Sequence, residues 1–115
     1  MQNAVPESII GVQVATVRIE SKDLRVLYET GRSRKFDLPP QVLRKFYMRI
    51  QTLEATERVA DLLADKGMHF ERYKDRYSIR LNDQYRLEFD VGWLDADQTQ
   101  LGIVDILDVS AHYGD

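Results

Sequence analysis

Five positively charged side chains lie within one short segment, residues 71–86, and could act together on a phosphate. They are Arg72, Lys74, Arg76, Arg80 and Arg86. Arginine suits this chemistry because its planar fork of donors matches phosphate oxygens and stays charged. The alternative is a solvated strand face whose arginines pair with nearby acidic residues such as Glu88 and Asp90.

Proton transfer would need further groups, and three residues could supply it. Glu71 could serve as a base, although an ion pair with Arg72 or Lys74 explains it equally well. His112 is a natural proton-transfer group near neutral pH, and Tyr113 could donate a proton or stack on a base. A frayed chain end is the alternative for both.

Other residues that could carry chemistry have structural explanations. We expect His69 to be a half-buried structural histidine, and Phe46 and Tyr47 to belong to the core. Trp93 would be a lid on the core or a partner contact. The acidic residues near it lack the regular spacing of a metal-binding loop, so no metal is assigned to them: Asp90, Asp95 and Asp97.

Two strands that would position the charged segment are indicated by alternating residue types. Apolar and polar residues alternate over 76–81 and again over 85–91, and Asn82-Asp83 is a plausible tight turn between them. The resulting hairpin has one apolar and one charged face, with Arg76, Arg80 and Arg86 on the same side. The nearly all-apolar run 101–107 predicts a strand that is buried on both faces or lies in the middle of the sheet, followed by a polar tail from residue 108.

The preceding half of the chain predicts one strand and then helices. Residues 13–19 resemble a strand, Ser21 stands at a helix N-cap position and Gly31 at a helix stop. A basic connection, 32–35, leads to prolines that suit a first helical turn. The clearest amphipathic helix follows, with its apolar stripe at Leu43, Phe46, Tyr47, Ile50 and Leu53. A short helix over 56–65 should turn Val59, Leu62 and Leu63 inward.

This order predicts one α+β domain with an N-terminal strand and two or three helices packed on one face of a mainly antiparallel sheet. The length of 115 residues suits a single core, which we place at residues 13–115, with 1–12 as an extension that need not be ordered.

The overall composition excludes several classes of protein. There are no cysteines, so disulfides and thiolate metal sites are absent. Neither a secretory leader nor a membrane-spanning run is expected, which favours the cytoplasm. The formal net charge is -3, so any binding of nucleic acid must depend on a local basic patch.

Residues 70–75 (FERYKD) and 76–89 (RYSIRLNDQYRLEF) resemble the core block of HigB toxins of the RelE/ParE superfamily. In that family a Leu-Lys-Gly-Asp-Arg stretch precedes a run close to Ser-Ile-Arg-Val-Asn-Asp-Gln-Trp-Arg-Leu. Residues 27–33 (LYETGRS) and 103–105 (IVD) also fit, so the resemblance covers roughly residues 15–113.

The resemblance implies a RelE-like fold and a ribosome-dependent endonuclease that cuts mRNA without a metal or other cofactor. It also implies a helix-turn-helix antitoxin of the HigA type, with DNA contacted only through the antitoxin complex. Attack by a 2′-hydroxyl needs a base, positive charge on the phosphorane and an acid. The implied catalytic residues are Arg80, Arg86, His112, Tyr113 and Glu71, and the implied RNA contacts are Arg72, Lys74 and Arg76.

The chain departs from the family pattern in three places. The loop between Lys74 and Tyr77 is shorter and lacks its glycines, and Glu71 stands where several HigB enzymes have a catalytic histidine. The usual Asp-Tyr-His ending is replaced by the longer DVSAHY of residues 108–113. Two rival functions therefore stay open: a ParE-like inhibitor of DNA gyrase, and a degenerate toxin that only binds its antitoxin and regulates an operon.

Overall fold

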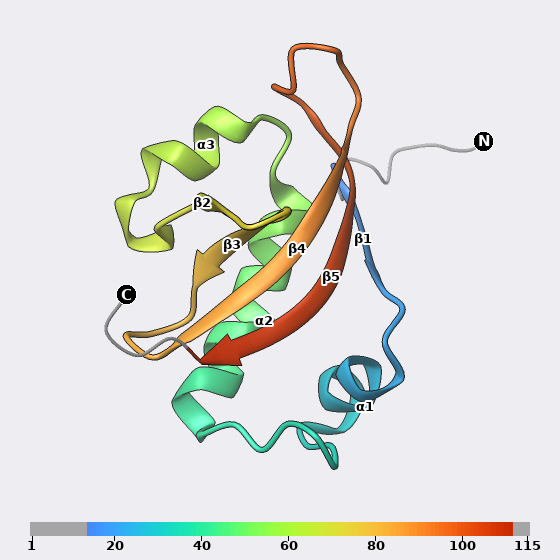
Figure 1. Ribbon diagram of the computed structural model, residues 1–115, viewed down its shortest axis with the longest axis vertical. Coiled ribbons are helices and arrows are strands. Elements are labelled where there is room, and N and C mark those ends of the chain that lie inside the picture. The colour runs from blue at the N-terminus through green and yellow to red at the C-terminus, as the bar shows by residue number, and fades with distance from the viewer. Residues whose placement is uncertain (1–13, 112–115) are drawn as a thin grey trace, which may run out of the picture.

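A computed structural model describes residues 14–111, and it shows three α-helices and one sheet (Figure 1). The elements follow in the order β1 (Thr16–Ile19), α1 (Lys22–Thr30), α2 (Pro40–Ala55), α3 (Val59–Ala64), the 3₁₀ helix η2 (Lys66–Met68), β2 (Glu71–Tyr73), β3 (Arg76–Arg80), β4 (Tyr85–Trp93) and β5 (Leu101–Ala111).

The five strands form a single sheet in the order β1-β5-β4-β3-β2. The pairs β2–β3, β3–β4 and β4–β5 are antiparallel, whereas β1 runs parallel to β5. In Figure 1 the two longest strands, β4 and β5, twist together along the molecule, and α2 lies behind them. The predicted α+β class, with an N-terminal strand and helices packed on a mainly antiparallel sheet, is confirmed.

The first two helices begin where the sequence predicts, and the first also ends there. The Ser21 side chain accepts a hydrogen bond from the Leu24 backbone N–H at 3.3 Å, which caps α1. Gly31 ends α1 in the left-handed conformation, with φ at 87°, which costs glycine little. Pro40 is the first residue of α2, where its missing N–H would have had no partner.

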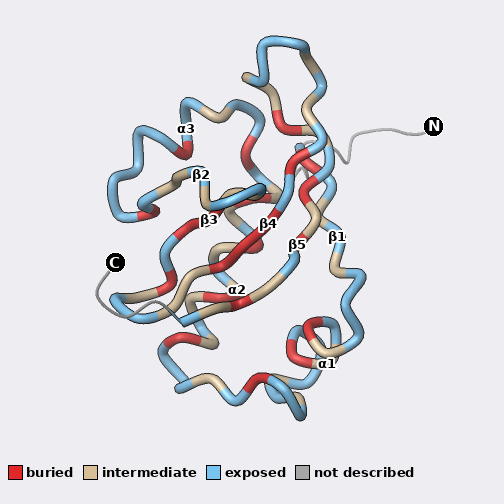
Figure 2. The backbone as a smooth tube through the Cα atoms, in the orientation of Figure 1, coloured by how far each residue is buried: buried red, intermediate tan, exposed pale blue. Residues whose placement is uncertain are grey.

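The core lies between the helices and the sheet (Figure 2). The apolar stripe of α2 is buried at Val42, Phe46, Ile50 and Leu53, whereas Leu43 and Tyr47 pack at its margin. Opposite them lie the inward side chains of the sheet, which are Ile79, Leu87, Phe89, Val104 and Ile106. Because side chains alternate along a strand, the other sheet face receives the polar residues.

One expectation about burial was wrong, and the last strand differs in part from what was expected. Leu63 is 60% exposed, because it neighbours the buried Leu62 in a short helix and the two side chains point in different directions. Of the two alternatives for the last strand, a place inside the sheet is confirmed, because β5 lies between β1 and β4. Burial on both faces is not found, since Ile103 and Leu107 are 40% and 37% exposed. Residues 108–111 continue β5, where a polar tail was expected.

Two expected boundaries also differ, that of the first strand and that of the third helix, which begins at Val59 rather than at residue 56. The first strand begins at Thr16, because the Val14 and Ala15 N–H groups donate to the Glu54 carbonyl at 2.8 Å and 3.0 Å instead of pairing with β5. Strand β2 was not expected, since three residues are too few to show alternation. No helix within residues 14–111 is long and apolar enough to cross a membrane.

Candidate functional site

The sheet face that points away from the helices carries a continuous set of polar side chains, called here the polar face. Strand register brings them together, because Arg80 pairs with Arg86, and Ser78 with both Glu71 and Glu88. The members are Glu71, Tyr73, Arg76, Ser78, Arg80, Arg86, Glu88, Asp108 and Ser110. The expectation that Arg76, Arg80 and Arg86 share one side of the hairpin is confirmed.

Arg86 is held on the polar face by three different contacts. Its guanidinium forms an ion pair with Glu71 and donates to the Ser78 hydroxyl at 3.2 Å. The guanidinium carbon lies 5.8 Å from the centroid of the Tyr73 ring, within the range of a cation–π contact. The Arg86 side chain is 17% exposed and that of Glu71 is 39% exposed, so solvent reaches the carboxylate more easily.

Arg76 and Glu88 form a second pair. Arg76 donates to Glu88 at 3.2 Å and to Asp75 at 3.3 Å, and the Ser110 hydroxyl donates to the other Glu88 oxygen. The Glu88 side chain is 7% exposed. Burial disfavours the charged form of Arg76, but the hydrogen bond to Asp75 and the charge of Glu88 outweigh it, so the pKa of Arg76 lies above its ordinary value.

Two further predicted cations, Arg80 and Lys74, lie around this centre. Arg80 lies at the end of β3, is exposed and pairs with Asp83 in the following turn. Lys74 lies in the β2–β3 turn with φ at 58°, and its ammonium is 5.2 Å from the Tyr73 ring centroid. Arg80 and Lys74 can therefore both contact a polyanion that binds on the polar face.

Arg72 lies apart from the polar face. It pairs across the strands with Tyr77, donates to the Tyr77 hydroxyl at 3.4 Å and covers its ring at 5.4 Å. Tyr77 stacks on Phe70 and belongs to the helix side of the sheet. The structure therefore brings together four of the five predicted cations and leaves Arg72 outside.

A pocket of about 330 Å³ opens beside the second ion pair. It is lined by Tyr73, Lys74, Asp75, Arg76, Glu88, Asp108, Ser110 and Ala111. Ala111 ends β5, and the next two residues in the sequence are His112 and Tyr113, which lie outside the described residues.

The chemistry available here is anion binding with proton transfer to a carboxylate. The two partly buried arginines, Arg76 and Arg86, each face a carboxylate, so an incoming phosphate would exchange for an acidic partner that is already present. Within residues 14–111, no three His, Asp or Glu side chains converge in a way that could hold a metal ion.

Two expectations about individual residues were wrong. The partner of Glu71 is Arg86, not Arg72 or Lys74, because strand pairing sets Arg86 diagonally across Ser78 from Glu71. His69 is exposed, since it follows the 3₁₀ helix in a left-handed conformation with φ at 49°.

Trp93 and Asp95 have structural roles, as the sequence allowed. Trp93 packs edge-on against Tyr77 at 5.8 Å, as a lid on the core. The Asp95 carboxylate accepts hydrogen bonds from the Thr99 side chain and from the Thr99 and Gln100 backbone N–H groups. These bonds hold the pKa of Asp95 below its ordinary value.

Sequence reasoning missed Tyr73 and Ser110 and treated Glu88 only as a solvated partner. Alternation along β4 does place Glu88 beside Arg86 on the polar face, so its presence there could have been inferred. The burial of Glu88 could not be inferred, because it depends on Ser110 and Asp108 of β5, a strand that a separate loop joins to β4.

A comparison with protein families found one match, to a model described as the RelE-like toxin of the type II toxin–antitoxin system HigB. The match spans residues 18–106, which is most of the chain and includes every described member of the polar face except Asp108 and Ser110. No curated protein matches the sequence.

Proposed function

This chain belongs to the family of RelE-like HigB toxins of type II toxin–antitoxin systems, and from that membership we propose that it cuts mRNA on the ribosome. The observation that carries the proposal is the Arg86–Glu71 pair on the polar face, with Arg76 and Arg80 beside it. It supplies both positive charge for a phosphate and a solvent-accessible carboxylate for a proton.

In the proposed reaction the 2′-hydroxyl oxygen attacks the adjacent phosphorus while Glu71 accepts the hydroxyl proton. Arg86, with Arg80, stabilises the negative charge that gathers on the phosphorane oxygens. His112 or Tyr113 donates a proton to the departing 5′-oxygen. The bond from phosphorus to that oxygen breaks, leaving a 2′,3′-cyclic phosphate and a free 5′-hydroxyl. Each proton transfer of this kind typically contributes about 10²–10⁴-fold to the rate.

We place the RNA strand over the polar face, with Lys74 and Arg76 contacting phosphates at the pocket. Tyr73 presents a ring beside these cations, which suits stacking on an unpaired base. Arg72 would contact RNA only from the edge formed by β2, because its side chain lies against Tyr77. The partners in this proposal are the ribosome, mRNA and a HigA-type helix-turn-helix antitoxin, which alone contacts DNA. The site of action would be the cytoplasm, with residues 13–115 as the folded domain.

One observation favours a second candidate, a module that binds its antitoxin without cutting RNA. Among the described residues, each arginine of the polar face already pairs with a carboxylate: Arg76 with Glu88 and Asp75, Arg80 with Asp83, and Arg86 with Glu71. A surface neutralised in this way attracts phosphate more weakly than a free basic patch.

The deciding experiment adds purified protein to a reconstituted translation reaction and maps mRNA ends by primer extension, with and without ribosomes. We expect cuts that require translating ribosomes and disappear in the Arg80→Ala/Arg86→Ala variant. The matched control is Arg25→Ala/Arg58→Ala, which removes two exposed arginines elsewhere and should cut normally.

Circular dichroism must show that both double variants are folded. Cleavage by a folded Arg80→Ala/Arg86→Ala variant would refute the assignment of the site. Intact mRNA with the folded wild-type protein would refute the endonuclease and favour the binding module, or gyrase inhibition where DNA damage signalling accompanies growth arrest.

A further inference from the structure

A concentration of unpaired positive charge lies away from the polar face, in one segment of the chain. Residues 31–52 contain six of the 16 Lys and Arg residues and a single acidic residue, Asp37, although the whole chain has a net charge of -3. Ion pairs among residues 14–111 involve only Arg18, Arg76, Arg80 and Arg86, so this segment contributes none. The charge of the chain is therefore segregated, with a basic segment on an acidic protein.

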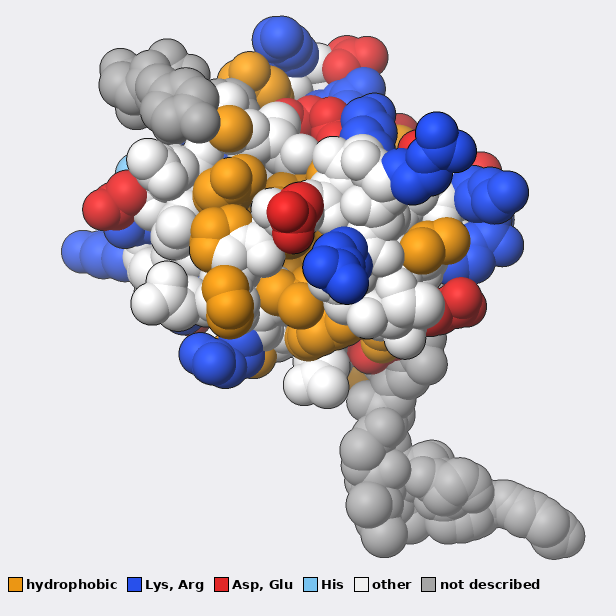
Figure 3. Space-filling view, turned by 90° about the horizontal axis from the view of Figure 1, so that it is seen from below, with side chains coloured by type: hydrophobic (Ala, Val, Ile, Leu, Met, Phe, Trp, Pro, Cys, Tyr) orange, Lys and Arg blue, Asp and Glu red, His pale blue; other side chains and the backbone are white. Residues whose placement is uncertain are grey.

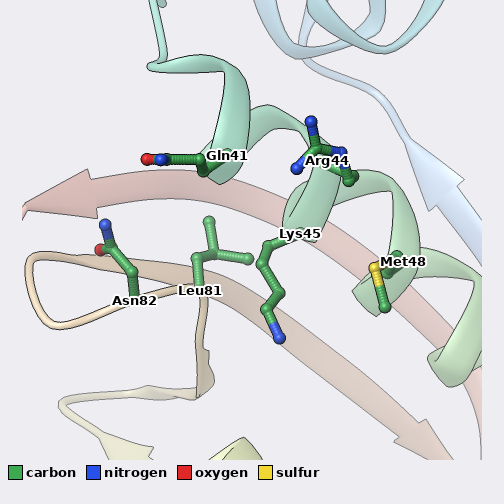
Figure 4. Close-up of a pocket in the computed structure, with 6 residues that line it drawn as sticks. All are labelled: Gln41, Arg44, Lys45, Met48, Leu81 and Asn82. Atoms are coloured by element: carbon green, nitrogen blue, oxygen red, sulfur yellow. The ribbon is translucent and has the colours of Figure 1, made fainter.

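Part of this segment forms one wall of a pocket on the helix side of the molecule. The pocket has a volume of about 220 Å³ and is lined by Gln41, Arg44, Lys45, Met48, Leu81 and Asn82. We call these six residues the α2 pocket. In Figure 4 the Leu81 side chain lies between Asn82 and Lys45, across from α2. Figure 3, which views the molecule from below, shows an apolar area with Lys and Arg side chains near it and an acidic side chain beside one of them.

The α2 pocket has an apolar floor and a basic rim. Leu81 is 2% exposed and forms the floor, whereas Met48 is 49% exposed and offers an apolar surface at one side. Arg44 is exposed and Lys45 partly so, and neither forms an ion pair with a described residue. Methionine adapts its shape to an incoming side chain, which is why it is common at protein-binding surfaces.

The geometry points to a protein partner, and we propose that the α2 pocket binds an acidic segment of the antitoxin. One aliphatic side chain of that segment packs on Leu81 and Met48, and its Asp or Glu neighbours pair with Arg44 and Lys45. The inference rests on the toxin-family assignment for the existence of an antitoxin, but it does not require that the chain cuts RNA.

Single-stranded RNA fits the α2 pocket less well. Its six lining residues include no aromatic ring, so an unpaired base would have no stacking platform. The volume lies below the ~300–1,000 Å³ typical of small-molecule sites, which suits a single side chain better than a nucleotide. The polar face, by contrast, has Tyr73 beside its cations.

The test compares binding of the cognate antitoxin to three versions of the full-length chain by isothermal titration calorimetry. The antitoxin is taken from the open reading frame adjacent to that of the toxin. Arg44→Glu/Lys45→Glu should weaken binding at least 10-fold, since like charges placed across an interface repel. The control, Lys22→Glu/Arg25→Glu, makes the same charge change on α1 and should bind like wild type. Met48→Ser should weaken binding by a smaller factor.

The Arg44→Glu/Lys45→Glu variant should remain folded, because neither side chain is buried, and thermal unfolding checks this. Wild-type affinity in this folded variant, or no binding by the wild-type chain, would overturn the proposal. Reduced toxicity in the absence of antitoxin, with antitoxin binding unchanged, would assign the surface to RNA instead. Failure of the endonuclease assay alone would leave this result standing, so the two proposals fail separately.

Discussion

Replacing Glu88 by glutamine should destabilise the fold much more than the same change at Glu71. Both residues are carboxylates on the polar face and both pair with arginine, but the Glu88 side chain is 7% exposed and that of Glu71 is 39% exposed. The two variants remove the same charge with almost no change in volume. They therefore isolate the effect of burial on an ion pair.

The expected magnitude for Glu88→Gln lies between two limits. Breaking a fully buried pair costs about 3–5 kcal/mol, because the remaining charge is left without a partner. An exposed pair contributes about 0–1 kcal/mol. Since the Arg76 side chain is 31% exposed, water can solvate part of it, and about 2 kcal/mol is expected. At roughly 4 °C per kcal/mol for a domain of this size, the Tm should fall by about 8 °C.

Glu71→Gln should lower the Tm by no more than about 4 °C, because the Glu71 carboxylate is 39% exposed and Arg86, although only 17% exposed, keeps the Ser78 hydroxyl and the Tyr73 ring as partners. Differential scanning calorimetry at neutral pH measures both variants. A third variant, Arg76→Leu/Glu88→Leu, removes both partners and should recover much of the stability that Glu88→Gln loses. Equal Tm values for the two single variants would refute the argument that burial sets the cost. The cleavage assay should show the reverse order, with the larger loss in Glu71→Gln.

Two further predictions concern the β4–β5 hairpin. Gly102→Ala should cost about 1–3 kcal/mol in urea unfolding, the range for an overpacked site, because the new Cβ would lie 2.7 Å from the Gly92 carbonyl oxygen and 2.9 Å from Leu94. The control Gly92→Ala, whose Cβ would meet nothing closer than 3.7 Å, should cost much less, and equal costs would contradict this reasoning. Asp95→Asn should be less stable than wild type at pH 7. Thermal unfolding measured at decreasing pH should show this difference vanish as the pH falls through the folded-state pKa of Asp95, which lies below 3.8. The sign follows because this pKa is lower in the folded state, so the unfolded state binds more protons and acid favours unfolding; a difference that persisted at lower pH would refute the role of the Asp95 charge.

Helix limits could be predicted from the sequence because local chemistry fixes them. Ser21 caps the backbone three residues ahead, Gly31 adopts a conformation that other residues avoid, and Pro40 lacks an N–H that the first helical turn does not need. Each signal acts within four residues of its own position. The α+β class followed from the order of these segments and the change to alternating residues after residue 75.

Burial of the last strand could not be predicted in the same way. An apolar run such as residues 101–107 is compatible with covering on one face or on both. Whether Ile103 and Leu107 are covered depends on what packs against the outer sheet face, where the described structure places no helix. Strand β2 was missed because pairing with β3, rather than its own three residues, defines it.

The same distinction between local and distant strand pairing explains which parts of the candidate site could be predicted. Arg80 and Arg86 were expected on one side because a short turn joins their strands, so the register could be counted directly. The acidic partner of Arg76 could not be inferred by counting register in this way. Glu88 is enclosed by β5, and the β4–β5 register shifts immediately after Glu88, so its contact with Ser110 depends on an irregularity that alternation does not reveal. A sequence can therefore indicate where an arginine stands on such a sheet before it indicates which carboxylate neutralises it. Because phosphate binding depends on both, the balance of charge on the polar face has to be taken from the folded structure.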